Sequence, residues 1–97
     1  MRKIFKGQSA LRLIVKTYTD LTGISDVCIR YLKPDKRKGS FSAVVSDTQN
    51  GIIYHDFQKC ELNQSGWWVF WADVEFGDGR KAAGEPVKIF VWEEGRI

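Results

Sequence analysis

Hydrophobic and polar residues alternate with a period of two through most of this chain, which is the pattern of half-buried β-strands. The clearest case is residues 67–76. One face of this stretch is apolar throughout, with Trp68, Phe70, Ala72, Val74 and Phe76. The opposite face begins aromatic and ends acidic, with Trp67, Val69, Trp71, Asp73 and Glu75. The first face predicts core positions, and the second predicts a surface that contacts another molecule.

Shorter stretches with the same alternation lie along the rest of the chain, and β-branched and aromatic residues dominate them. They cover residues 11–16, 27–32, 41–46, 52–55 and 87–92, with a further short strand around 3–5. Turn signals separate them, and the best hairpin turns are Asn50-Gly51 and Asp78-Gly79. Only residues 57–63 have a sequence that favours a helix, and this segment is too short for more than one helical turn.

This order of elements predicts an all-β fold, namely an immunoglobulin-like antiparallel β-sandwich of about seven short strands. A small barrel is the alternative architecture. With 97 residues, the chain is expected to be a single β-sandwich domain over 1–97, in which 1–9 form an N-terminal arm. The register predicts a mostly buried core of Leu11, Leu13, Val27, Ile29, Trp68, Phe70, Val74, Phe76, Val87 and Ile89.

Composition and charge narrow the cellular context and the partners. The net charge of +3 is too small to indicate nucleic acid on its own. No stretch approaches the roughly 18 apolar residues of a membrane span, so no membrane partner is expected. The basic start of the chain lacks the apolar segment of a signal peptide, which predicts synthesis in a bacterial cytoplasm. We therefore expect Cys28 and Cys60 to be free thiols.

The sequence offers no constellation of residues for catalysis or metal binding. His55 is the only histidine, and we expect it to be a solvated strand residue. The acids Asp73, Glu75 and Asp78 are typical of a solvated face and not of a calcium site. The basic run 33–39 is typical of a solvated connection between strands. The prediction is a protein that is not an enzyme and has no catalytic residue, metal or cofactor.

The outer aromatic residues are the remaining candidate for function. If the last strand pairs beside the tryptophan-rich strand, one outer face carries Trp67, Val69, Trp71, Phe90 and Trp92. An exposed apolar patch of this kind marks an interface, and tryptophan is a preferred anchor in protein interfaces. The alternative is that a bulge shifts the register and that some of these side chains belong to the core.

Several short motifs follow one another along nearly the whole chain. They are Gly7-Gln8-Ser9, Asp20-Leu21-Thr22-Gly23, Lys33-Pro34-Asp35, Gly66-Trp67-Trp68-Val69-Phe70-Trp71-Ala72 and Asp78-Gly79-Arg80. Their order resembles that of small tail-associated proteins of bacteriophages and prophages, and of the N-terminal immunoglobulin-like domain of phage baseplate upper proteins. In that family a strand ends in a Lys-Pro-Asp-Gly type turn, and a later strand carries Gly-x-Trp-x-x-x-Ala. The turn of this chain departs from the family, because it continues with Lys36-Arg37-Lys38-Gly39 and is longer and more basic.

The resemblance implies a non-enzymatic phage or prophage structural or assembly protein of the tail or baseplate, which acts through protein–protein contacts. Its partners would be other tail or baseplate proteins, with a homo-oligomer as a further option, and its final location would be the virion tail. The alternative function is a carbohydrate- or host-surface-binding module, in which Trp67, Trp71 and Trp92 stack on sugar rings.

Overall fold

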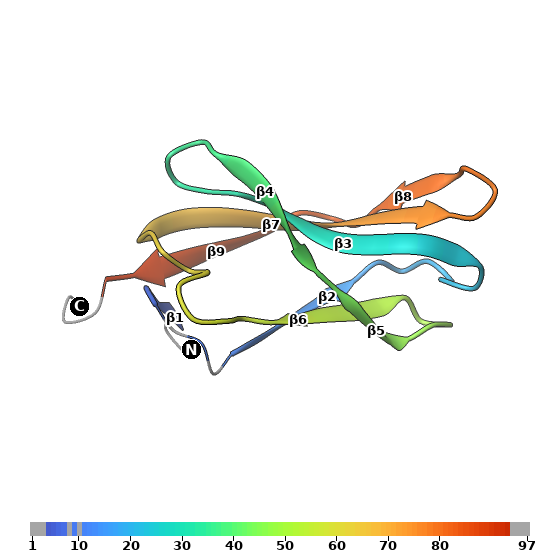
Figure 1. The fold of residues 1–97 in the computed structure, drawn as a ribbon, viewed down its shortest axis with the longest axis horizontal. Helices are drawn as coiled ribbons and strands as arrows, with labels where there is room; N and C mark the ends of the chain where they lie inside the picture. The colour runs from blue at the N-terminus through green and yellow to red at the C-terminus, as the bar shows by residue number, and fades with distance from the viewer. Residues whose placement is uncertain (1–3, 8, 10, 94–97) are drawn as a thin grey trace.

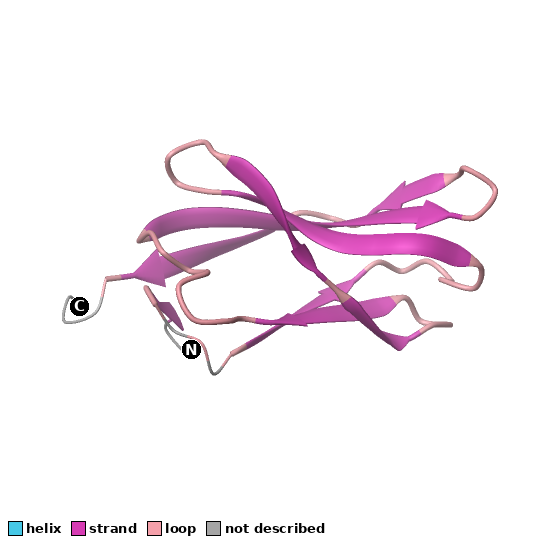
Figure 2. Ribbon diagram, viewed as in Figure 1, coloured by secondary structure: helices cyan, strands magenta, loops and turns pink. Residues whose placement is uncertain are grey.

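The chain folds into strands joined by loops, and the described residues contain no helix (Figure 2). The computed structural model describes residues 4–7, 9 and 11–93. Its strands are β1 (Ile4–Phe5), β2 (Arg12–Lys16), β3 (Ile24–Leu32), β4 (Lys38–Ser42), β5 (Val44–Asp47), β6 (Ile52–Asp56), β7 (Gly66–Phe76), β8 (Lys81–Ala83) and β9 (Val87–Trp92). The predicted all-β sandwich is confirmed. Of the predicted N-terminal arm, residues 1–3 and 8 lie outside the described residues, and Ile4–Phe5 form β1.

The strands form two layers, which Figure 1 shows one above the other. The six-stranded sheet has the order β1-β9-β7-β3-β4, and β8 pairs with the second half of β7. The three-stranded sheet has the order β2-β6-β5. Among the described strands, β1 and β9 pair in parallel, and the other pairs are antiparallel. The described part of the chain contains no helix that could cross a membrane.

The predicted strand at 41–46 is two strands, because the chain changes sheets at Ala43. Ser42 ends β4 and pairs with Cys28 in the six-stranded sheet, whereas Val44 begins β5 and pairs with Tyr54 in the three-stranded sheet. Figure 1 shows this crossing as the green segment that runs from the upper layer to the lower one. This crossing links the two layers covalently over a single residue.

The core lies between the two sheets and is rich in aromatic side chains. Trp68 is fully buried, stacks on Phe70 with ring centroids 5.8 Å apart, and donates its indole N–H to the Gln64 carbonyl over 3.0 Å. Of the ten predicted core residues, Leu13, Ile29, Trp68, Phe70, Val74 and Phe76 are buried, and Leu11, Val27 and Ile89 are partly buried. Val87 was predicted wrongly, because it is the first residue of β9 and is 38% exposed at the strand end.

His55 is buried, and the prediction of a solvated strand residue was wrong. Its ring is 7% exposed and lies parallel to the Phe41 ring, with centroids 4.6 Å apart. Nδ1 lies 2.7 Å from the Ser42 carbonyl oxygen, and Nε2 lies 2.8 Å from Oε1 of Glu61. A carbonyl oxygen only accepts hydrogen bonds, so Nδ1 carries a proton. His55 therefore bonds the crossing between the sheets to the loop that follows β6.

The loop between β6 and β7, residues 57–65, packs onto the core and contains no helical turn in the structure. Its side chains Phe57 and Leu62 are buried, and the amide of Glu61 donates to the Gln58 carbonyl over 3.2 Å in a simple turn. The Gly7 amide donates to the Leu62 carbonyl over 2.7 Å. This loop thereby holds the segment after β1 against one end of the sandwich.

Candidate functional site

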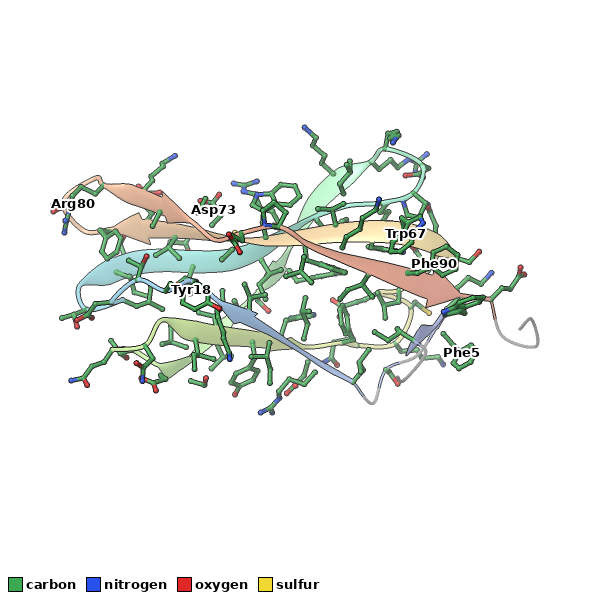
Figure 3. The ribbon with its side chains drawn as sticks, turned by 180° about the vertical axis from the view of Figure 1, so that it is seen from behind. Phe5, Tyr18, Trp67, Asp73, Arg80 and Phe90 are labelled. Atoms are coloured by element: carbon green, nitrogen blue, oxygen red, sulfur yellow. The ribbon has the colours of Figure 1, made fainter. Side chains whose placement is uncertain are left out.

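The outer face of the six-stranded sheet brings together the five residues predicted as an interface. In β7 and β9 the register pairs Trp67 with Phe90 and Val69 with Lys88. Side chains two apart on a strand share a face, so Trp71 and Trp92 lie on this face as well. We call Trp67, Val69, Trp71, Phe90 and Trp92 the outer aromatic face. Figure 3 shows Trp67 and Phe90 side by side, at the opposite end of the molecule from Arg80.

Three rings of this face form a row of edge-to-face contacts. Trp67 and Phe90 have ring centroids 5.1 Å apart at 78°, and Phe90 and Trp92 have centroids 4.8 Å apart at 66°. Trp67 is 52% exposed, although it belongs to the longest strand of the sheet. Phe5 of β1, which the sequence did not suggest as a site residue, is in register with Trp92. The aromatic residues on this face therefore come from three neighbouring strands, β1, β9 and β7.

Basic side chains lie on the same outer face, and sequence reasoning missed this. Lys88 is in register with Val69, Val69 with Leu32, and Leu32 with Lys38, so this row crosses four strands. The ammonium nitrogen of Lys88 lies 4.7 Å from the centroid of the Trp67 ring. Lys38 is far from the aromatic residues along the chain, and it reaches the same sheet face because β3 lies between β7 and β4.

The acidic half of β7 does not form a cation site. Arg30 of β3 donates a hydrogen bond from Nε to Asp73, and this bond raises the pKa of Arg30 above its ordinary value. Glu75 is in register with Lys81 of β8. Within the described residues, no group of three or more His, Cys, Asp or Glu side chains is placed to hold a metal ion.

A second exposed apolar row lies on the outer face of the three-stranded sheet. Ile14 of β2 is in register with Tyr54 of β6, which is in register with Val44 of β5. Ile14 is 57% exposed and Val44 is 52% exposed. Tyr18 follows β2 with a positive φ of 56° and is 79% exposed. The apolar row depends on strand pairing, and the exposure of Tyr18 depends on backbone geometry. No sequence motif predicted either of them.

A shallow hollow of about 480 Å³ lies near the hairpin that joins β7 to β8, at the end opposite the aromatic rings. Thr19, Thr22 and Arg80 are among its lining residues. The nearby Asp20 carboxylate accepts a hydrogen bond from the Thr22 hydroxyl over 2.6 Å, and Arg80 donates to Asp78 over 2.7 Å. These polar groups are already paired with one another, which leaves none of them in a catalytic arrangement.

The two cysteines are free, as predicted, and they lie in different environments. Cys28 is partly buried on β3, where burial raises the pKa of its thiol above the ordinary value. Cys60 is exposed in the loop after β6 and has a positive φ of 69°. A cysteine with a raised thiol pKa is a weak nucleophile and a weak metal ligand at neutral pH.

The comparison with known proteins identifies a solved structure with a similar fold. No protein-family model matches the chain, and no curated protein matches its sequence. A solved structure that resembles it is CopC from Methylosinus trichosporium OB3b, with a TM-score of 0.60 and 14% sequence identity. The match covers 98% of this chain and 88% of the CopC chain. The chain therefore has a β-sandwich fold similar to that of CopC.

This comparison overturns the phage resemblance. CopC is a periplasmic copper-binding protein and not a phage tail or baseplate protein, so the predicted virion role and the tail and baseplate partners were wrong. The carbohydrate-binding alternative is not favoured either. The predicted location in the cytoplasm or the virion conflicts with the periplasmic neighbour. The prediction that the chain is not an enzyme agrees with the CopC-like fold. The short motifs suggested the wrong family because such turn sequences are common in β-sandwich proteins.

The described residues of this chain do not fit a copper site. Copper prefers imidazole, thiolate and thioether ligands, and the chain has one His, two Cys and one Met. Both ring nitrogens of His55 are engaged, by the Ser42 carbonyl and by Glu61. Cys28 lies on the outer face of the six-stranded sheet, whereas His55 lies in the core. The fold is similar to that of CopC, but the described residues do not gather the ligands of a metal site.

Proposed function

We propose that this chain is a non-enzymatic protein-binding domain, and that the outer aromatic face is its binding surface. We also propose that residues 1–97 act as one domain in this role. The observation that carries the proposal is Trp67, which is 52% exposed within a cluster of aromatic rings on a sheet surface. Apolar surface of this kind is typical of contact sites between proteins.

The energetics support such a contact. Burying a tryptophan fully removes roughly 150–250 Å² from water, and half-exposed Trp67 has about half of that area left to bury. At about 25 cal/mol per Å² this contributes a few kcal/mol before the costs of association are subtracted. Phe90 contacts the Trp67 ring edge to face, and Trp92 contacts Phe90 in the same way. An anchor that is already ordered loses little side-chain entropy when it binds.

Site-specific photo-crosslinking in the cells that express this chain tests the proposal. A benzophenone amino acid replaces Trp67 in one variant and Ile14 in a matched control. The two positions have similar exposure, 52% and 57%, and lie on the outer faces of opposite sheets. We expect one defined protein to be crosslinked at position 67 and not at position 14.

Two results would count against this function. Equal crosslinking at both positions would show that the chain makes only unspecific contacts. Adducts at position 14 alone would assign the contact to the row of Ile14, Tyr54 and Val44 on the three-stranded sheet. In each case the unfolding midpoint of the variants in urea is measured beside the parent chain, so that a misfolded variant is recognised.

A further inference from the structure

We infer that the partner presents an acidic surface with an apolar centre to the outer aromatic face. This inference rests on the proposed protein-binding function and adds the chemistry of the partner. The observation behind it is the row Lys88, Val69, Leu32 and Lys38, which places a lysine at each side of an apolar strip. Both lysines are exposed.

More positive charge lies beside this row. The turn between β3 and β4 carries Lys36 and Arg37, both exposed, directly before Lys38. Lys6 is exposed directly after β1, and its amide donates to the Trp92 carbonyl over 2.7 Å. The basic turn and the segment after β1 lie at the end of the molecule that carries Trp67 (Figures 1 and 3).

Two described aspartates, one near this end and one on the outer face, are occupied within the chain. Asp35 accepts hydrogen bonds from the Gln64 side chain over 2.7 Å and from the Arg37 amide over 3.0 Å, which lower its pKa. On the outer face itself, Asp73 is paired with Arg30. Glu93 is exposed and directly follows β9. Among the described residues, Lys6, Lys38 and Lys88 therefore give this end an excess of exposed positive charge.

The arrangement of the rings favours a protein over single-stranded nucleic acid. Stacked bases need flat aromatic faces that are open to solvent. Here Trp67 and Phe90 meet edge to face, and the ammonium group of Lys88 lies 4.7 Å from the centre of the Trp67 ring. Such a surface offers ring edges and apolar contact area. Complementary charges at the rim of a contact chiefly raise its specificity and association rate.

A binding assay with a defined acidic polypeptide tests this inference. The probe is a fluorescent random copolymer of glutamate and tyrosine, followed by polarisation at low and at moderate salt. The double variant Lys38→Glu with Lys88→Glu removes the two lysines of the row. Its control, Lys16→Glu with Lys81→Glu, makes the same change in net charge at exposed lysines away from the aromatic rings. We expect the first pair to weaken binding about tenfold and the control pair less than about twofold.

Other results would overturn the inference. Equal weakening by both double variants would show unspecific attraction between charges. Tighter binding of a twenty-nucleotide oligothymidine, or of phosphatidylglycerol vesicles, with dependence on Trp67 would assign the face to a nucleic acid or a lipid surface. If the copolymer does not bind while position 67 still crosslinks one protein, the acidic partner is wrong and the binding function stands. If neither result is obtained, both proposals fail.

Discussion

Neighbouring tryptophans in β7 have opposite environments. Trp68 is fully buried between the sheets, and Trp67 is 52% exposed on the outer face. The alternation of side chains along a strand causes this difference, and it was predictable from the sequence alone. Substitution of Trp68 should therefore reduce the stability of the fold, whereas substitution of Trp67 should reduce binding.

Replacing each of these tryptophans by alanine gives the first prediction. Trp68→Ala should lower the free energy of unfolding by about 3–5 kcal/mol, because it removes core contacts and leaves a cavity. Trp67→Ala should lower it by less than about 1 kcal/mol, since the Trp67 ring lies at the surface. Urea unfolding followed by circular dichroism measures both. Equal losses would show that the two faces are not distinct.

The thiols give a second prediction. Cys60 should react with iodoacetamide at pH 8 at least about tenfold faster than Cys28, because burial both shields Cys28 and raises the pKa of its thiol. Mass spectrometry of peptides after timed quenching measures the two rates. The variant Cys60→Ser should retain only the slow reaction. A faster reaction at Cys28 would mean that β3 opens readily.

His55 shows the limit of sequence reasoning at this scale. Alternation put His55 on one face of its strand but did not say which face is covered. Its partners, the Ser42 carbonyl and Glu61, come from segments on either side of β6. Only the fold brings them to the two ring nitrogens. A polar residue that looked solvated is therefore a buried connection between loop and sheet.

At the scale of elements, several turns depend on aspartate side chains that accept hydrogen bonds. These bonds lower the pKa of each aspartate, and the donors are Thr22 for Asp20, Gln64 and Arg37 for Asp35, Asn50 for Asp47 and Arg80 for Asp78. The ionised forms are the ones that the folded state favours. Each carboxylate therefore contributes stability above its ordinary pKa, and this contribution is lost as the pH falls through the lowered value.

Acid unfolding follows as a third prediction. The melting temperature should be constant near neutral pH and should fall as the pH drops below the ordinary aspartate pKa of 3.8. The variant Asp47→Asn, which cannot ionise, should show a lower melting temperature at pH 7 and a shallower fall in acid. Calorimetry over a series of pH values measures this. A melting temperature that rises on acidification would contradict the assignment.

The order of strands was harder to predict than the strands themselves. Turn signals and alternation placed β2, β6, β7 and β9 closely, because those signals are local. The division of 41–46 at Ala43 and the position of β3 between β7 and β4 depend on contacts between distant segments. Lys38, the one basic residue of β4, was therefore predicted to be part of a separate solvated run, although it shares a face with Trp67 and Trp71.

The whole molecule shares its fold with CopC at 14% identity, and a likeness at that level concerns the fold and not the site. As a fourth prediction, the chain should not retain stoichiometric copper. Incubation with Cu(I) under reducing conditions, followed by gel filtration and a chelator competition assay, should leave less than about 0.1 equivalents bound, because His55 is engaged at both ring nitrogens. One tightly held equivalent that disappears in His55→Gln would contradict this.

The position of the proposed binding surface was partly predictable from the sequence. The five residues of the outer aromatic face lie together as the period-two pattern predicted, because β9 pairs with β7 in the expected position. The family resemblance, in contrast, misidentified the partners. Turn motifs report the geometry of the chain and carry no information about its partners.

The central claim is that the outer aromatic face binds a protein. Its most direct test is the affinity of the protein captured at position 67 for the chain, measured by titration calorimetry with Trp67→Ser and Ile14→Ser in parallel. We predict that Trp67→Ser raises the dissociation constant at least about tenfold and that Ile14→Ser changes it less than about twofold, with both variants folded. An unchanged affinity for Trp67→Ser, or a larger loss for Ile14→Ser, would contradict the claim.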